Sequence, residues 1–159
     1  MIAAVDTNIL LDILDNDPEF NKSSAELLEK QSQEGSLIIS PVVFSELLVF
    51  FLKRHDTAAA SAKLKEFLHD LTIQVRDFTE KDFTRAAESW QKFSKIKKVA
   101  CPKCGAENTF YCRKCSVLVH WRNHLLTDFL IGAHAQNNAG ILLTRDRGYY
   151  ANYFSLKLA

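Results

Sequence analysis

Short apolar segments alternate with helical segments along the chain, and this alternation most narrowly limits the fold. The expected strands are residues 2–5, 36–39, 71–75 and 141–144. Strands separated by helices predict an α/β domain with a mostly parallel sheet, because parallel neighbours need a long crossover connection. The 159 residues are the length of one domain with an ordinary core, so we expect a single domain over residues 1–159.

Capping signals predict where two of the helices begin. Ser40 before Pro41 is typical of a helix cap followed by a first-turn proline, and that helix is expected to run to about Arg54. Thr79, with Asp82 three residues later, predicts a second helix start. The other helices are expected at residues 8–14, 22–30, 60–71 and 124–137, and the helix after Thr79 would bury Phe83, Ala87 and Trp90.

Four acidic residues occupy places that lead to one edge of this sheet. Asp6 ends the first strand and Asp146 follows the last one. Glu46 and Asp128 lie in otherwise apolar helices, each in the second turn if Asn123 caps the later helix. Helical side chains lean toward the N-terminus of their helix, and ligand sites of parallel sheets lie beyond the carboxyl ends of the strands. We therefore expect the four carboxylates to converge there.

Such a cluster of acids predicts a site for a hard divalent cation. An unpaired carboxylate in apolar surroundings costs several kcal/mol, and four together repel one another unless a cation neutralises them. Ligands that are all oxygen favour Mg²⁺ or Mn²⁺. The alternative is that each acid caps a helix or pairs with a basic side chain.

Two Cys-x-x-Cys pairs predict a second, different metal site. Cys101, Cys104, Cys112 and Cys115 are the only cysteines of the chain. Four thiolates at this spacing suit tetrahedral Zn²⁺ in a closed structural site. We expect a zinc-knuckle module inserted at residues 100–122, whose folding depends on the metal. Redox-active dithiols and an iron–sulfur cluster are the alternatives.

Charge is distributed unevenly around this insert. Residues 91–122 carry eight basic residues and one acid, so they are near +7 while the rest of the chain is near −6. A basic block beside acidic residues suits a polyanionic substrate such as RNA, and a solvated lysine-rich helix end is the alternative. The possible RNA contacts are Lys97, Lys98, Lys103, Arg113, Lys114 and Arg122, together with Arg145 and Arg147 near the last acid.

Composition also bounds where the protein acts. The N-terminus has no basic region followed by a long apolar run, so we expect no secretory signal. The longest apolar run, residues 47–52, is too short to span a bilayer. A cytoplasmic protein without a membrane partner is expected.

Four motifs in order resemble those of the PIN-domain ribonucleases, and most of all the VapC-type toxins of toxin–antitoxin pairs. They are residues 5–10 (VDTNIL), 45–47 (SEL), 128–135 (DFLIGAHA) and 143–150 (LTRDRGYY). The resemblance implies a three-layer α/β/α fold and metal-dependent cleavage of RNA. It also implies a homodimer and a VapB-like antitoxin as partner. It makes Asp6, Glu46, Asp128 and Asp146 the catalytic, metal-binding acids, and Thr7, Asn8 and Thr144 their polar supports.

The cysteine insert departs from the compact toxins, and it leaves three functions open. The first is a toxin-type endoribonuclease held by an antitoxin. The second is a housekeeping PIN nuclease in ribosomal or other RNA processing. The third is a zinc-containing RNA-binding module that does not cut, and intact acids at all four motif positions argue against it.

Overall fold

A four-stranded parallel sheet forms the centre of the molecule. The structure is a computed structural model, and it describes residues 1–94, 99–100, 107–108, 111–117 and 126–159. The strand order is β3-β2-β1-β6. All three pairings are parallel, with Ala3 opposite Leu37 and Ile141 and with Leu37 opposite Ile73. The α/β prediction is confirmed, and the strands are β1 (Ile2–Val5), β2 (Ser36–Ile39), β3 (Ile73–Val75) and β6 (Ile141–Leu143).

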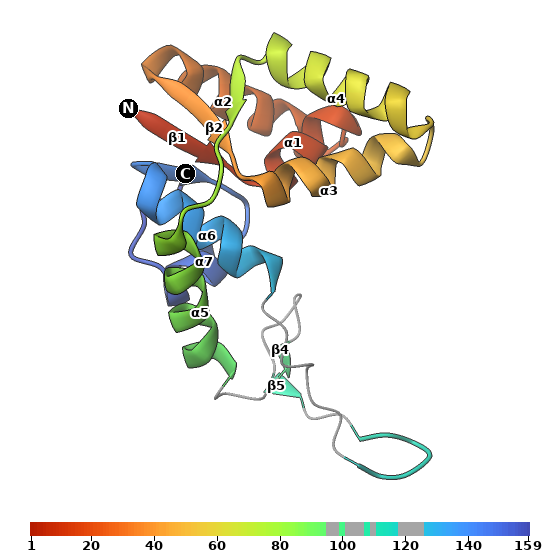
Figure 1. The fold of residues 1–159 in the computed structure, drawn as a ribbon, viewed down its shortest axis with the longest axis vertical. Helices are drawn as coiled ribbons and strands as arrows, with labels where there is room; N and C mark the ends of the chain where they lie inside the picture. Colours follow the sequence, from red (N-terminus) through yellow and green to blue (C-terminus); the bar gives the residue numbers. More distant parts are fainter. Residues whose placement is uncertain (95–98, 101–106, 109–110, 118–125) are drawn as a thin grey trace.

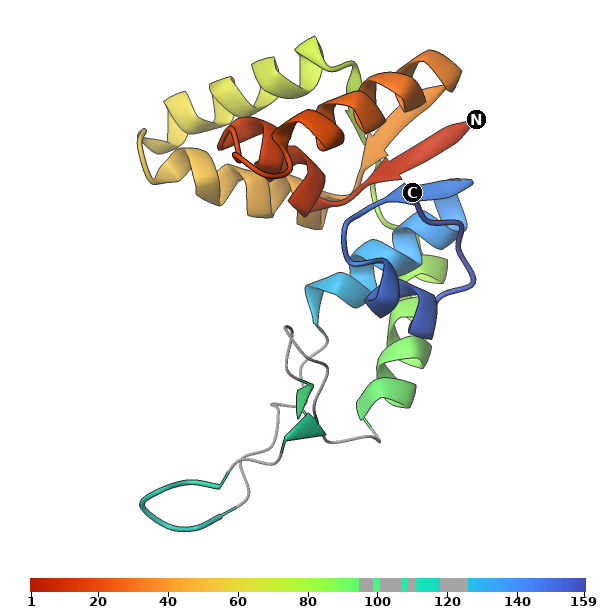
Figure 2. The same cartoon turned by 180° about the vertical axis from the view of Figure 1, so that it is seen from behind.

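Helices cover both faces of this sheet and make three layers (Figure 1). Helices α1 (Thr7–Leu14), α2 (Asn21–Glu34), α3 (Pro41–Leu52) and α4 (Thr57–Asp70) lie on one side, and α5 (Glu80–Ser94), α6 (Thr127–Asn138) and α7 (Arg147–Tyr153) on the other (Figures 1 and 2). The connections β1–β2 and β2–β3 run across the sheet in one direction, and the connection from β3 to β6 runs back in the other. Because crossovers between parallel strands are right-handed, the two helix groups lie on opposite faces. None of the helices in the described ranges is long and apolar enough to cross a membrane.

Two features of the C-terminal region were absent from the sequence prediction. Helix α7 follows directly after Asp146, where only a loop was expected. The last residues then run beside β6, with a parallel bridge between Leu142 and Leu158. The Ala159 N–H donates to the Leu142 carbonyl at 3.0 Å, and the Thr144 N–H donates to the Ala159 carbonyl at 3.0 Å. The free edge of β6 is thereby covered next to the expected site.

The two predicted capping signals are confirmed. The Ser40 hydroxyl accepts the Val43 N–H at 3.3 Å at the start of α3. The Asp82 carboxylate accepts the Thr79 N–H at 2.7 Å and the Thr79 hydroxyl at 2.9 Å at the start of α5. Each cap satisfies backbone groups that the first helical turn leaves without a partner.

The predicted apolar face of α5 is partly wrong. Phe83, at 51% exposure, and Ala87 face solvent, while Asp82, Ala86 and Ser89 are buried. Asp82 has no exposed surface because it also accepts hydrogen bonds from the side-chain amides of Asn137 at 2.8 Å and Asn138 at 3.1 Å on α6. Ser89 donates to the Tyr153 carbonyl at 3.2 Å. Polar side chains with these partners can be buried at little cost. The buried face of α5 therefore differs from the face that its apolar residues predicted.

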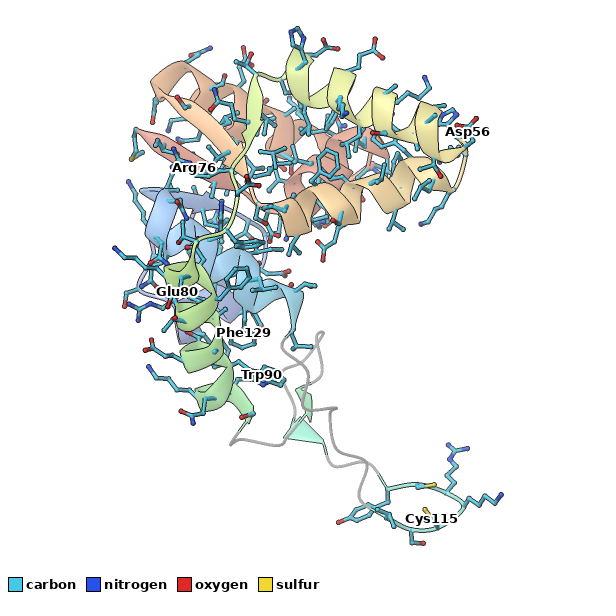
Figure 3. The ribbon with its side chains drawn as sticks, in the orientation of Figure 1. Asp56, Arg76, Glu80, Trp90, Cys115 and Phe129 are labelled. Carbon is cyan, nitrogen blue, oxygen red and sulfur yellow. The ribbon has the colours of Figure 1, made fainter. Side chains whose placement is uncertain are left out.

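Aromatic packing joins the three helices below the sheet. Phe129 of α6 has no exposed surface and contacts Trp90 edge-on, with 5.5 Å between the ring centroids (Figure 3). Tyr149, Tyr153 and Phe154 of the C-terminal region complete the cluster around it. Gly132 lets this packing close, because a Cβ there would lie 2.4 Å from the Phe154 ring. The cluster anchors the residue next to Asp128.

Helix α6 begins later than the sequence predicted. It starts at Thr127 with Leu126 at the cap position, so Asp128 lies in the first turn and not in the second. The expected cap, Asn123, lies outside the described residues. A first-turn acid is favoured by the helix dipole, which places partial positive charge at this end.

A short antiparallel pair, β4 (Val99–Ala100) and β5 (Glu107–Asn108), lies within the predicted insert. Most of residues 100–122 fall outside the described ranges, so the zinc-knuckle module remains a prediction.

Candidate active site

Asp6 is the centre of the polar cluster at the carboxyl edge of the sheet. Its backbone N–H donates to the Leu143 carbonyl at 3.0 Å, which ties the end of β1 to the end of β6. Its side chain is buried, with 5% exposure for the residue. One carboxylate oxygen accepts the Thr7 N–H at 2.8 Å, and the other accepts the Thr144 hydroxyl at 2.7 Å. The carboxylate is therefore held in one orientation at the start of α1.

Asn8 connects Asp6 to the loop after β6. Its side-chain amide donates to Asp6 at 2.9 Å, to Thr144 at 3.3 Å and to Asp146 at 3.4 Å. Its amide oxygen accepts the Arg145 N–H at 3.3 Å, and the Asp146 N–H donates to the Thr144 hydroxyl at 3.0 Å. The structure thus brings Asn8, Thr144 and Asp146 together with Asp6, as the sequence predicted.

Glu46 and Asp128 reach the same edge from helices on opposite faces of the sheet. The Thr7 hydroxyl donates a hydrogen bond to Glu46, which joins α1 to α3. Asp128 is half-buried. Its charge contributes to the raised pKa of Asp6, and the charges of Glu46 and Asp146 contribute to its own raised pKa. All four predicted acids and their three polar supports therefore form one cluster.

The folded structure makes the central carboxylates hard to ionise. Burial raises the pKa of Asp6 to about 6, against the opposing effect of its hydrogen bonds to Thr144 and Thr7, and repulsion from Asp128 and Asp146 adds to the rise. Burial also raises the pKa of Asp128, with further repulsion from Glu46 and Asp146. Carboxyl groups with raised pKa values in a shared cleft are typical of functional sites, because burial and like charge both penalise the ionised form.

Two tyrosines that the sequence analysis did not single out adjoin the acids. Burial, together with repulsion from Asp6 and Asp128, raises the pKa of the buried Tyr150. Tyr149 shows the same direction of pKa shift, with burial as the main cause and Asp128 next. The Tyr149 hydroxyl is buried and has no hydrogen-bond partner in the part of the chain that the structure describes. Both hydroxyls are therefore neutral at physiological pH, and the Tyr149 hydroxyl is an unused donor beside the acids.

The donor set fits a hard cation, although it does not form a closed cage. Among the described residues, no three His, Cys, Asp or Glu side chains are arranged closely enough to hold one metal ion as they stand. The groups present are carboxylate oxygens, which Mg²⁺ and Mn²⁺ prefer. Burial is the main cause of the raised pKa of Asp6, and the negative charge of Asp128 and Asp146 adds to it. A divalent cation between these carboxylates would compensate that charge.

Comparison with known proteins assigns the fold. The family model described as PIN domain matches residues 3–154. The chain belongs to the PIN-domain family. No curated protein sequence matches it at a significant level.

Solved structures with the same fold cover nearly the whole PIN domain. VapBC2 from Rickettsia felis, solved bound to a DNA fragment from its promoter, is 22% identical with a TM-score of 0.66 and covers 100% of this chain and 98% of that chain. VapBC-1 from nontypeable Haemophilus influenzae is 15% identical with a TM-score of 0.66, covering 100% and 97%. VapC20 from Mycobacterium tuberculosis, described as a Sarcin-Ricin loop cleaving toxin, is 12% identical with a TM-score of 0.54, covering 96% and 95%. At these identities the likeness shows a shared fold.

Arg145, a predicted RNA contact, makes two contacts within this PIN domain. Its guanidinium lies 2.8 Å from the Asp12 carboxylate, whose side chain is only 3% exposed, and 4.3 Å from the centroid of the Phe20 ring. The Arg145 side chain still has 37% of its surface exposed, so its predicted contact with RNA stays a prediction. Arg147 is exposed and borders a cavity of about 560 Å³ between Phe20 and Thr144. Asp12 was not identified from the sequence, because nothing in the sequence around a single acid in an apolar helix indicates which basic residue it contacts.

Two of the four predicted zinc ligands lie in a described turn of the PIN domain. Cys112 is partly buried and Cys115 is exposed, and Figure 3 shows Cys115 on its loop. The Ser116 N–H donates to the Cys112 carbonyl at 2.8 Å, and Ser116 has a φ of 55°. Hydrogen bonds from the backbone N–H groups of Cys115 and Lys114, and from the Cys115 side chain, lower the pKa of the Cys112 thiol. Such a turn favours the thiolate form that binds metal.

The other predicted residues of this region are distributed unevenly. Arg113 and Lys114 are exposed on the turn. The remaining predicted zinc ligands and RNA contacts lie outside the described residues: Lys97, Lys98, Cys101, Lys103, Cys104 and Arg122.

Proposed function

We propose that the protein is a metal-dependent endoribonuclease that cleaves RNA phosphodiester bonds as the toxin of a toxin–antitoxin pair. The proposal rests on four acids that converge at the carboxyl edge of a PIN-domain sheet, where burial and mutual repulsion raise the pKa of Asp6 to about 6. Four acids held this way would be a costly arrangement unless the protein uses a cation there.

The chain supplies a defined role for each acid. Asp6 is the central ligand for Mg²⁺ or Mn²⁺, because it is buried and its carboxylate accepts more hydrogen bonds than those of the other three acids. Asp128 is the second ligand, Asp146 a third, and Glu46 orients the attacking water. When bound, the cation lowers the pKa of a water molecule and stabilises negative charge on the phosphate. Thr7, Asn8 and Thr144 hold the carboxylates so that little reorganisation is needed during cleavage.

Solved structures with this fold support the proposed substrate and partner. VapC20 is described as a Sarcin-Ricin loop cleaving toxin, and VapBC2 was solved on promoter DNA. By analogy we assign RNA as the substrate, a VapB-like antitoxin as the partner and a homodimer as the assembly. The basic residues 91–122 provide charge that suits RNA. A cytoplasmic location remains a prediction from the sequence.

Cleavage of defined RNAs tests this function. With Mg²⁺ or Mn²⁺ the purified protein is expected to cut internal phosphodiester bonds, and with EDTA cleavage should cease. Asp128→Asn is expected to lower the cleavage rate by about 100-fold or more, because a lost charge-stabilising group costs roughly 3 kcal/mol of transition-state stabilisation. The products are followed on a gel with end-labelled RNA.

The matched control is Asp70→Asn, which changes an exposed acid at the end of α4. It is expected to cleave like the wild type. Undiminished cleavage in EDTA, or equal rates for Asp128→Asn and the wild type, would contradict the proposal.

We further propose that Cys101, Cys104, Cys112 and Cys115 bind one structural Zn²⁺. The support is their spacing, together with the turn whose N–H groups face the Cys112 thiol. Thiolates, not carboxylates, are the ligands of this second metal, so the two metals occupy chemically distinct sites.

Elemental analysis tests the zinc site. We expect one zinc per chain in the wild type and none in Cys112→Ser/Cys115→Ser, because two remaining thiolates cannot close a tetrahedral site. Ser23→Ala/Ser32→Ala changes two hydroxyls far from the turn in sequence and should leave the zinc content unchanged. Iron in place of zinc would favour the iron–sulfur alternative.

A further inference from the structure

We propose that the Asp12–Arg145 ion pair is a positioning device that fixes the turn between β6 and α7 against α1. This turn carries Thr144 and Asp146, and the inference rests on the proposed nuclease function. We assign neither Asp12 nor Arg145 a contact with the reacting atoms. They act through the placement of Asp146.

The contacts of Asp12 make it a fixed anchor. Its side chain is 3% exposed, and each of its carboxylate oxygens has a partner. One oxygen lies 2.8 Å from the Arg145 guanidinium, and the other accepts the Ser24 hydroxyl at 2.6 Å. A buried carboxylate is tolerated only with such partners, so Asp12 and Arg145 constrain each other strongly.

Arg145 is held to α1 at two places, one turn of the helix apart. Its backbone N–H donates to the Asn8 side chain at 3.3 Å, while its guanidinium reaches Asp12, four residues further along. Residues four apart lie on the same face of a helix. Phe20 stacks on the guanidinium, with 4.3 Å to the ring centroid. The side chain therefore has one preferred position.

The residues on either side of Arg145 belong to the acid cluster. Thr144 donates to Asp6 at 2.7 Å, and the Asp146 N–H donates to Thr144 at 3.0 Å. Asp146 itself is exposed, and among the described residues its carboxylate receives a single hydrogen bond, the long 3.4 Å one from Asn8. The Asp146 carboxylate is thus weakly held, although the Asp146 carbonyl accepts the Tyr149 and Tyr150 N–H groups at 3.1 and 3.2 Å. The Asp12–Arg145 ion pair adds a restraint on the residue next to it.

Steady-state cleavage kinetics separate positioning from RNA binding. Arg145→Gln and Asp12→Asn are each expected to lower kcat by about 10- to 100-fold, since small misplacements of catalytic groups cost rates of this size. KM should stay within about twofold of the wild type. A raised KM with unchanged kcat in Arg145→Gln would show that Arg145 contacts RNA directly, and it would overturn the proposal.

The double variant Asp12→Asn/Arg145→Gln separates positioning from mere stability. It removes both charges, so it should unfold at a higher temperature than Arg145→Gln, which leaves Asp12 buried without its counter-charge. Its kcat should nevertheless stay as low as that of the single variants, because both act on one turn. Recovery of kcat together with stability would overturn the proposal. Arg54→Gln, which breaks the exposed 3.8 Å pair with Asp15, is the matched control and should leave kcat unchanged.

Hydrogen exchange tests the positioning role of the Asp12–Arg145 ion pair independently of activity. If the wild type fails to cleave RNA, that result refutes the proposed function, and the exchange measurement still tests the ion pair. In Asp12→Asn, the amides of residues 145 and 146 should exchange about tenfold faster or more, because their hydrogen bonds to Asn8 and Thr144 loosen. Amides within α4 should be unaffected. Unchanged exchange at residues 145 and 146 would overturn the positioning role.

Discussion

Asp6→Asn is expected to lower the rate of RNA cleavage by about 1000-fold or more, the largest effect of any single substitution in the site. A factor of this size corresponds to about 4 kcal/mol of transition-state stabilisation, which is the scale of a lost central metal ligand. Asp6 is the only one of the four acids that is buried at the end of β1 and hydrogen-bonded to both α1 and the β6 strand end. Single-turnover cleavage of a defined RNA with Mn²⁺ measures the rate.

The same substitution is expected to stabilise the metal-free protein at neutral pH. Burial raises the pKa of Asp6 from 3.8 to about 6, so the folded state binds the Asp6 proton more tightly than the unfolded state does. Its contribution to stability is complete below about pH 4 and is lost as the pH rises through 6. Above pH 6 the ionised group costs up to about 3 kcal/mol, which Asn avoids. We expect a gain of about 1–3 kcal/mol at pH 7.5 that disappears toward pH 4.

Asp82→Asn is the matched control, because Asp82 is also buried but its pKa is shifted in the opposite direction. Burial alone would raise that pKa, but the hydrogen bonds from Thr79 and Asn137 outweigh it and lower it. Asp82 therefore stabilises the fold above its unfolded pKa, and this contribution is lost as the pH falls through the folded pKa. Asp82→Asn should lose stability at pH 7.5 and still cleave RNA. Cleavage by Asp6→Asn within tenfold of the wild type would contradict the assignment of Asp6 as the central ligand.

The convergence of the acids was predictable because it depends on repeating geometry. Asp6 follows β1 directly, and parallel strands bring their carboxyl ends to one edge. Glu46 faces the same edge because α3 begins at Pro41 right after β2, and a helical side chain leans toward the helix start. Asp128 reaches the site even though α6 begins at Thr127, since one turn of difference moves it only a few ångströms along the axis.

The contacts of Asp12 with Arg145 and of Asp82 with Asn137 could not be predicted, because they join distant segments of the chain. Asp12 meets Arg145, which is 133 positions later in the chain, and Asp82 meets Asn137. The periodicity of α5 placed Phe83 inside. The adjacent face is buried instead, because Asp82 accepts a hydrogen bond from Asn137 and Ser89 donates one to the Tyr153 carbonyl. A pattern of apolar residues reports average burial, and it fails where polar groups find partners.

Helix α7 was missed for a different reason. It has seven residues, Arg147–Tyr153, and its second residue is Gly148. Helices of this length are unstable alone, so tertiary packing must supply their stability. Tyr149 packs edge-on against Phe129 and Tyr153, and Tyr153 packs on Phe129 with tilted rings. The helix exists because α6 offers an aromatic surface that sequence periodicity does not reveal.

Mn²⁺ is expected to raise the melting temperature of the wild type by about 5–10 °C at pH 7.5. A ligand at 100 times its Kd stabilises a protein by about 2.7 kcal/mol, and each kcal/mol is worth about 2–4 °C in a chain of this size. The cation binds ionised carboxylates, so it must displace the protons of Asp6 and Asp128, whose pKa values are raised. Displacing the Asp6 proton alone should raise the Mn²⁺ concentration for half of the effect about tenfold for each pH unit below about 6, and displacing the Asp128 proton as well makes the rise steeper.

Two variants decide whether the acids or the cysteines cause this shift. Asp6→Asn should abolish the Mn²⁺-dependent rise in melting temperature, because it removes the central ligand while the fold remains. Cys112→Ser/Cys115→Ser should keep the rise, since thiolates are poor ligands for a hard cation compared with carboxylates. A rise that is independent of pH between 5 and 7, or one that persists in Asp6→Asn, would place the cation elsewhere. The expected pattern follows from burial and charge together. Burial, with added repulsion from Asp128 and Asp146, makes Asp6 hard to ionise, and a divalent cation among the four carboxylates would favour its ionised form.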